Sequence, residues 1–207
     1  MNESPSNNKS QIRAEIWNLM EKRGIARFPR PVFNRIPNFE GSENAAQRLI
    51  EIKEYKSART IFCNPDSLQR PVREHILRDG KLLIMAPPRL KEDGFLVLSK
   101  KSILTDKIRR ASTIKGAFQF GSIAKPSTIE KIDLKIAGSV AVDTKGGRVG
   151  KGGGVVNWLR ILSCSLLTDP ANTDNIVSDT LTKEQKNRIR KLADQAINCR
   201  YWSEVFS

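Results

Sequence analysis

The sequence is poor in the residues on which several large classes of protein depend. Its 207 residues include a single histidine, His75, and three cysteines, at positions 63, 164 and 199. A catalytic triad or metal site built on histidine is therefore nearly excluded, and a solvated helix residue is the better interpretation of His75. The cysteines form no Cys-x-x-Cys pair, which argues against both a disulfide framework and a zinc site.

Long apolar runs are also missing. No stretch approaches the ~18 consecutive apolar residues of a membrane-spanning helix. The first nine residues are polar and lack the apolar core of a signal peptide. We therefore expect a cytoplasmic protein without a membrane partner. A hydrophobic content of 39% is ordinary for a chain that buries a real core, and the length favours one domain with a tail, which we expect to be a monomer.

Acidic residues are few compared with basic ones. The chain has 22 Asp and Glu against 36 Lys and Arg, a formal net charge of +14. Such a surface favours anionic partners, including nucleotides, polycarboxylates and nucleic acid. Aromatic residues make up only 6%, however, and the cations are dispersed without an aromatic stripe for bases. Diffuse charge of this kind is more often a solubility feature, so an RNA-associated basic protein stays as an alternative interpretation.

The pattern of apolar residues predicts alternating helices and strands. Helical spacing begins at Ser10 and stops at Gly24, and further helices are expected over 42–53, 71–80 and 103–110. Buried strands are expected over 59–63, 81–86, 94–98 and 134–142. This alternation predicts an α/β fold of three layers, a largely parallel, Rossmann-like sheet flanked by helices. Ligands of such sheets bind beyond the carboxyl ends of the strands.

The segment Arg27–Phe39 cannot be helical, because three of its positions are proline. It is expected to run extended over the surface of the domain, anchored by its phenylalanines at positions 28, 33 and 39. The other irregular segment is Gly146–Gly154, where six of nine residues are glycine. Glycines let backbone N–H groups turn toward an oligophosphate, and Arg148 and Lys151 add positive charge there. The spacing fits neither a Walker A nor a dinucleotide-binding sequence, and the alternative is a flexible surface loop.

Two motifs occur in the order typical of one family. Ile136-Ala-Gly-Ser-Val-Ala-Val-Asp143 precedes Gly147-Arg-Val-Gly-Lys-Gly-Gly-Gly154, and Phe-Pro-Arg-Pro and Arg-Ile-Pro-Asn-Phe both occur within Arg27–Phe39. Ile136–Asp143 followed by Gly147–Gly154 resembles the C-terminal signature of the 5-formyltetrahydrofolate cyclo-ligase (methenyltetrahydrofolate synthetase) family. Arg27–Phe39 resembles one branch of that family, the methenyltetrahydrofolate synthetase domain-containing proteins. The likeness covers about residues 9–154.

The resemblance implies an enzyme that uses ATP and Mg²⁺ to cyclise 5-formyltetrahydrofolate to 5,10-methenyltetrahydrofolate, with a reduced folate as its small-molecule partner. Lys9 and Arg13 match the family's N-terminal Lys-x-x-Leu-Arg, which contacts phosphate, and the glycine loop supplies the other expected contacts. The expected ATP-binding residues are therefore Lys9, Arg13, Arg148, Gly150, Lys151, Gly152 and Gly154. Arg148 and Lys151 would be the catalytic cations that neutralise the transferring phosphoryl group. The expected substrate contacts are Arg35, Asn38, Asp66 and Gln69.

The sequence departs from the family pattern after Gly154. The family continues with an aromatic residue and an acid that serves Mg²⁺, whereas Val155 and Asn157 stand in those places. Asn157 could offer a carbonyl oxygen to the metal but no charge. We therefore expect a cyclo-ligase-like domain over residues 1–169, with 1–9 disordered, and a divergent helical tail over 170–207. A non-catalytic relative that binds nucleotide or folate is the alternative function.

Overall fold

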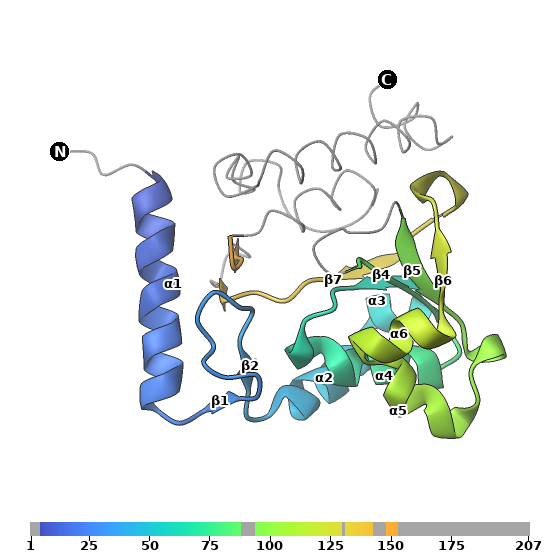
Figure 1. Cartoon of the computed structure of the whole chain (residues 1–207), viewed down its shortest axis with the longest axis horizontal. Coiled ribbons are helices and arrows are strands. Elements are labelled where there is room, and N and C mark those ends of the chain that lie inside the picture. Colours follow the sequence, from blue (N-terminus) through green and yellow to red (C-terminus); the bar gives the residue numbers. More distant parts are fainter. Residues whose placement is uncertain (1–4, 88–93, 130, 143–147, 153–207) are drawn as a thin grey trace.

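The computed structural model describes residues 5–87, 94–129, 131–142 and 148–152, around a central five-stranded sheet (Figure 1). The strand order is β6-β5-β4-β3-β7. The bounds are Thr60–Cys63 for β3, Leu82–Met85 for β4, Phe95–Leu98 for β5, Ser122–Ala124 for β6 and Leu134–Ile136 for β7. Strand β3 is parallel to both β4 and β7, whereas β5 is antiparallel to β4 and β6. The predicted α/β class is confirmed, and the sheet is mixed, parallel only over β4-β3-β7.

Six α-helices lie in the described part of the chain. They are α1 (Pro5–Lys22), α2 (Ser42–Glu51), α3 (Lys53–Ser57), α4 (Arg70–Arg78), α5 (Ile108–Ala111) and α6 (Ile114–Phe120). Helix α1 begins at Pro5, ahead of the expected start at Ser10, because proline is tolerated in the first turn of a helix. Residues 5–9, which were expected to be disordered, are therefore helical.

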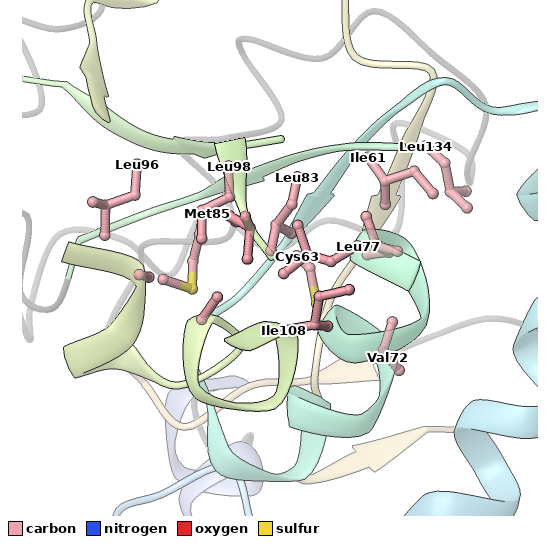
Figure 2. Close-up of a cluster of buried hydrophobic side chains, with 14 of the residues drawn as sticks. Ile61, Cys63, Val72, Leu77, Leu83, Met85, Leu96, Leu98, Ile108 and Leu134 are labelled. Carbon is pink, nitrogen blue, oxygen red and sulfur yellow. The ribbon is translucent and has the colours of Figure 1, made fainter. Parts of the chain in front are cut away.

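Helix α4 and its neighbours cover one face of the sheet, and alternate strand residues point toward them (Figure 2). Ile61, Cys63, Leu83, Met85 and Leu98 are all fully buried on this face. Helix α4 supplies Val72, Ile76 and Leu77, α5 supplies Ile108, and α6 supplies Ala117. Because each large side chain of this kind contributes about 1.5–3 kcal/mol when buried, this cluster is the main source of stability.

The strand expected over 134–142 is in fact two strands. β7 pairs with β3 only as far as Ile136 opposite Cys63. β3 ends there because Pro65, two residues further on, has no N–H for a ladder. The chain then leaves the sheet and forms β8 (Ala141–Val142), which pairs with β9 (Arg148–Val149) in a separate hairpin. Arg148 and Val149 of the glycine-rich segment, Gly146–Gly154, therefore pair with β8.

Strand β3 lies where the connections of the sheet diverge. Helix α4 leads from β3 to β4 on one side, and β7 pairs with β3 on the other. Crevices form at the carboxyl ends of strands at such switch points. Asn64–Asp66 follow β3 and Ala137–Ser139 follow β7, so these two short segments border the expected ligand position.

Cys63 offers a test of this packing, since its thiol is fully buried. Burial raises the pKa of Cys63 from an ordinary 9.0 to about 11, although the Arg73 guanidinium beside it favours the thiolate. A raised pKa means that the folded state keeps a proton that the unfolded chain loses. The stabilisation is therefore complete below pH ~9 and is lost as the pH rises through about 11.

We expect the free energy of unfolding to fall by about 2–3 kcal/mol more in the wild type than in Cys63→Ala over this range, at about 1.4 kcal/mol for each pKa unit. Urea titrations of both proteins at several pH values between 8 and 11 measure the difference, which should shrink steadily. A difference that stays constant with pH would show that this thiol does not titrate as the packing requires.

Candidate functional site

The N-terminal helix brings a cation to the glycine-rich segment. Arg13, in the middle of α1, donates from Nε to the carbonyl oxygen of Gly150 over 2.7 Å. The two residues are 137 positions apart in sequence. Helix α1 also packs on both strands of the β8–β9 hairpin. Two of the expected phosphate-binding residues, one from each end of the family likeness, therefore lie side by side.

A second cation, Lys9, stands one helical turn before Arg13. Burial and then the positive charge of Arg13 lower the pKa of the Lys9 amine. Burial likewise lowers the pKa of the Arg13 guanidinium. Two neighbouring cations whose charged forms are disfavoured are favourable for an anion, because a bound phosphate would stabilise both charges.

Gly152 shows why the segment needs glycine. Its φ is +98°, in the left-handed region that favours glycine. A Cβ added there would have the guanidinium carbon of Arg13 as its nearest neighbour, at 3.9 Å. The backbone at Gly150 and Gly152 thus lies next to the Arg13 head group.

The opposite side of this segment is held by an acid. Lys151 Nζ lies 3.1 Å from Asp66 Oδ1. The Asp66 side chain is only 14% exposed and that of Lys151 is 42% exposed. Asp66 was expected to contact substrate, and the structure places its carboxylate against a cation expected to hold phosphate. The carboxyl end of β3 and the glycine-rich segment therefore form one site.

Gln69 links the chain after β3 to the end of β7. It is 2% exposed and donates from Nε2 to the Ile136 carbonyl oxygen over 3.0 Å. Its Oε1 atom has no hydrogen-bond partner among the described residues, and neither has Oδ1 of the buried Asn64. Because buried polar atoms usually have a partner, these two acceptors are candidates for contact with a ligand. Asn64 was missed as a site residue, although its place directly after a buried strand could have indicated it.

Two of the expected substrate contacts, Asn38 and Arg35, lie in the proline-rich segment Arg27–Phe39, and their side chains differ in how they are engaged. Asn38 donates from Nδ2 to the Phe28 carbonyl oxygen over 2.9 Å and accepts from the Phe39 amide over 3.1 Å. Both polar ends of this side chain therefore stabilise the segment itself. Arg35 is exposed, and the hydrogen bonds it makes are through its backbone: its amide donates to the Val32 carbonyl oxygen over 3.2 Å, and its carbonyl oxygen accepts from Trp17 Nε1 over 3.1 Å. Arg35 is thus the better placed of the two to meet a ligand.

The proline-rich segment is docked through aliphatic side chains and through two of its three phenylalanines. Phe33 packs edge-on against Trp17, and Phe39 packs against the buried cluster around Trp17, as predicted. Val32 and Ile36 are buried in a cluster with Trp17, whereas Phe28 is 84% exposed. The prediction that Phe28 anchors the segment was therefore wrong, because β1 (Ala26–Arg27) and β2 (Asn38–Phe39) pair and the loop between them turns Val32 and Ile36 inward. Ile36 also packs against the chain that follows β7, since a Cβ on Gly138 would lie 2.7 Å from its Cγ2 atom.

The remaining predicted residues are described partly or not at all. Arg148 is placed by its backbone in β9. Gly154 and Asn157 lie outside the described residues. Within the described ranges there is no group of three His, Cys, Asp or Glu side chains that could hold a metal. None of the described helices is long and apolar enough to cross a membrane.

Comparison with known proteins identifies the relatives of this chain. Residues 5–176 match the 5-formyltetrahydrofolate cyclo-ligase family. The methenyltetrahydrofolate synthase domain-containing proteins of Mus musculus and Bos taurus are 41% and 39% identical over 147 residues, and that of Homo sapiens is 35% identical. These matches cover 70% of this chain and 38–40% of the relatives, so the chain spans about two fifths of their length. With the family match extending over most of its sequence, the chain belongs to the 5-formyltetrahydrofolate cyclo-ligase family.

Proposed function

We propose that this protein catalyses the ATP-dependent cyclisation of 5-formyltetrahydrofolate to 5,10-methenyltetrahydrofolate. The observation that supports the proposal best is that Arg13 bonds to Gly150 while the next residue, Lys151, pairs with Asp66 after the carboxyl end of β3. The cations suit an oligophosphate, and the buried acceptors of Asn64 and Gln69 suit the N–H groups of a heterocycle beside it. The net charge of +14 also suits a polyanionic pair of substrates.

The proposed reaction needs positioning more than acid–base groups. The formyl oxygen takes the γ-phosphoryl group of ATP, and ADP leaves. The neighbouring folate nitrogen then attacks the formyl carbon and loses its proton, and the C–O bond breaks to release phosphate. Arg13 and Lys9 would hold the phosphate chain, and Lys151 would neutralise charge on the transferring group. Arg148, which lies in the glycine-rich segment, would act with Lys151. The proline-rich segment would shield the folate from water through its contact at Gly138.

Mg²⁺, when bound, would neutralise the phosphates and orient them for transfer. Mg²⁺ in such sites usually keeps several waters and takes one or two carboxylates besides the substrate phosphates. Asp66 is the carboxylate that lies beside the glycine-rich segment, and Asn157 would contribute an amide oxygen at most.

One assay separates this function from its alternatives. Purified protein mixed with 5-formyltetrahydrofolate, ATP and Mg²⁺ should develop the near-ultraviolet absorbance of the methenyl product. Binding of nucleotide or folate without that absorbance would replace the proposal by a non-catalytic binding role, which the loss of the acid at Asn157 would explain. Salt-sensitive binding of RNA, with no affinity for either small molecule, would support the RNA-associated alternative.

Gly138→Ala should damage the folate side of the site and leave ATP binding intact. The new methyl group would meet Ile36 Cγ2 at 2.7 Å and Leu68 Cδ2 at 3.1 Å, so the proline-rich segment has to shift. We expect a loss of about 1–3 kcal/mol in the free energy of unfolding and a several-fold higher KM for folate. Urea unfolding and steady-state kinetics measure the two effects.

Gly24→Ala is the control, because it strains a residue with φ +67° but meets no atom within 4 Å. It should lower stability without changing either KM. An unchanged KM for folate in Gly138→Ala would remove the proline-rich segment from the substrate site.

A further inference from the structure

Arg73 is a charged residue in an apolar place. It lies on the inner face of α4 beside Val72, Ile76 and Leu77, and it is 2% exposed. Burial lowers the pKa of its guanidinium, since a low-polarity environment disfavours the charge. A buried cation is costly, and an aliphatic side chain could fill this space. The contacts of the guanidinium therefore need an explanation beyond packing.

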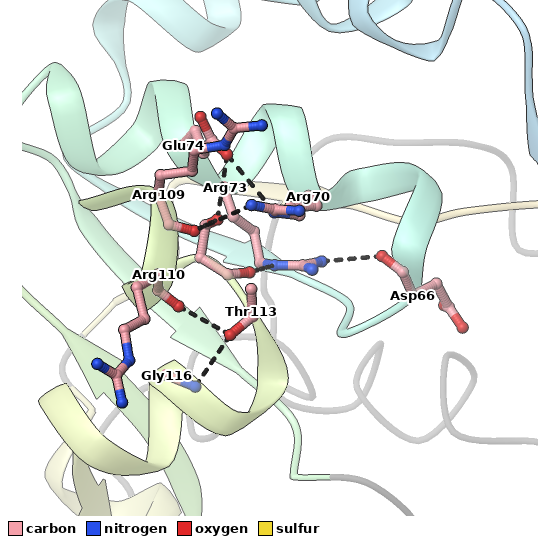
Figure 3. Close-up of polar contacts among 9 residues, drawn as sticks. Asp66, Arg70, Arg73, Glu74, Arg109, Arg110, Thr113 and Gly116 are labelled. Atoms are coloured by element: carbon pink, nitrogen blue, oxygen red, sulfur yellow. Dashed lines mark hydrogen bonds and ion pairs between the residues drawn. The ribbon is translucent and has the colours of Figure 1, made fainter. Parts of the chain in front are cut away.

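These contacts gather two separate segments around one side chain (Figure 3). Arg73 Nε donates to the Ser112 carbonyl oxygen over 2.8 Å, just after α5. Its Nη1 atom donates to the carbonyl oxygens of Asn64 and Asp66, the latter at 3.0 Å. A planar guanidinium has donors in a fixed fork, whereas a lysine amine offers one nitrogen on a flexible stem. Arg73 thus fixes the backbone after β3 relative to α4 and α5.

Asp66 carries this constraint to the glycine-rich segment. Its carbonyl oxygen accepts from Arg73 and from the Gln69 amide, the latter at 3.1 Å, while its carboxylate faces Lys151 at 3.1 Å. With the backbone held at its carbonyl, the direction of the carboxylate is restricted. Asp66 is also near enough for its charge to act on Arg73. The contacts form a continuous chain, Arg73 to Asp66 to Lys151.

We propose that Arg73 is a positioning residue for the nucleotide, which fixes Asp66 so that its carboxylate holds Lys151 at the glycine-rich segment. This inference rests on the proposed function, because Lys151 matters here as a phosphate-binding cation. Arg73 touches neither substrate in this arrangement and acts only through Asp66. Its role is to keep the lysine amine from sampling the solvent before ATP arrives, which lowers the entropy lost on binding.

A thermodynamic cycle tests the chain of contacts. ATP affinity is measured calorimetrically for the wild type, Arg73→Lys, Lys151→Met and the double variant. We expect Arg73→Lys to weaken binding about tenfold when Lys151 is present and less than about twofold in the Lys151→Met background, since contacting residues couple and independent ones add. Arg78→Lys, an exposed arginine of the same helix, should bind as the wild type does. Equal losses in both backgrounds would overturn the proposal.

A second measurement does not depend on nucleotide. Acetylation of Lys151 by acetic anhydride is followed by mass spectrometry, with Lys22 as the internal reference. Its rate should rise several-fold in Arg73→Lys and in Asp66→Asn, which leaves the core arginine untouched, and stay unchanged in Arg78→Lys. An unchanged rate in both folded variants would overturn the positioning role. A raised rate in a protein that binds no ATP would retain the link from Arg73 to Lys151 and reject the proposed function alone.

Discussion

Replacing Arg13 by methionine should weaken ATP binding by about ten- to a hundredfold. The side chain is half-buried against the glycine-rich segment, where it both places Gly150 and brings positive charge to the ligand. Charge-assisted contacts contribute roughly 1.5–3 kcal/mol each, and methionine keeps the volume while it removes the charge and every donor. The effect should therefore exceed that of any exposed cation on the same helix.

Lys22→Met is the matched control, because Lys22 is an exposed cation in the last turn of α1. Its removal changes the net charge by the same amount but leaves the hairpin contact intact. Isothermal calorimetry with ATP at two salt concentrations separates local from long-range charge, since screening weakens only the latter strongly. Equal losses in the two variants would reduce Arg13 to a contributor to the general positive field.

The parts of the fold that were predictable are those with strong local signals. The apolar runs before Pro65 and after Gly80 indicated β3 and β4, and Pro71 and Gly80 marked the two ends of α4. Partner strands were harder, because an apolar run does not show whether its neighbour is antiparallel, as β5 is to β4. The short β6 went unnoticed, since its Ser-Ile-Ala sequence has no strand pattern of its own.

The candidate site was predictable residue by residue but not as an arrangement. Family likeness indicated Arg13, and positive charge within a glycine-rich loop indicated Lys151, yet no local pattern showed that Asp66 would pair with that lysine. Long-range contacts of this kind arise from the topology, which places the carboxyl end of β3 beside the β8–β9 hairpin. Arg73 was missed for a different reason. The local signal for Arg73 was a single cation within the apolar face of α4. That pattern is typical of a buried arginine with specific partners, but it does not show which partners.

The glycine-rich segment is held by residues from two distant parts of the chain. Helix α1 supplies Arg13, the loop after β3 supplies Asp66, and the glycine-rich segment lies between them. Gly150 accepts a hydrogen bond from the Arg13 side chain, and Lys151 forms an ion pair with Asp66. An ion pair whose lysine is 42% exposed contributes little to the stability of the fold.

The largest gain in turnover should come from Asn157→Asp. Asn157 stands where the family has an acid, in a sequence that otherwise keeps the glycines and the arginine of the motif. A carboxylate beside Mg²⁺ and phosphate supplies charge that an amide lacks, and hard cations prefer anionic oxygen. Residues that support a metal site commonly change affinity or activity by about 10–100-fold, so kcat should rise by at least about tenfold and saturate at lower Mg²⁺.

Asn175→Asp is the control for this change, since it adds the same charge outside the motif. The measurement is the rate of methenyl product formation across a Mg²⁺ titration, with ATP affinity determined separately. Adding Val155→Tyr should raise the rate further, because the family carries an aromatic residue there and the two positions would act as one site. Gain of activity would identify a lapsed enzyme on an intact scaffold. Unchanged kinetics in a double variant that still binds ATP would show that the acid is not what limits this chain, and that Asp66 or water completes the metal site.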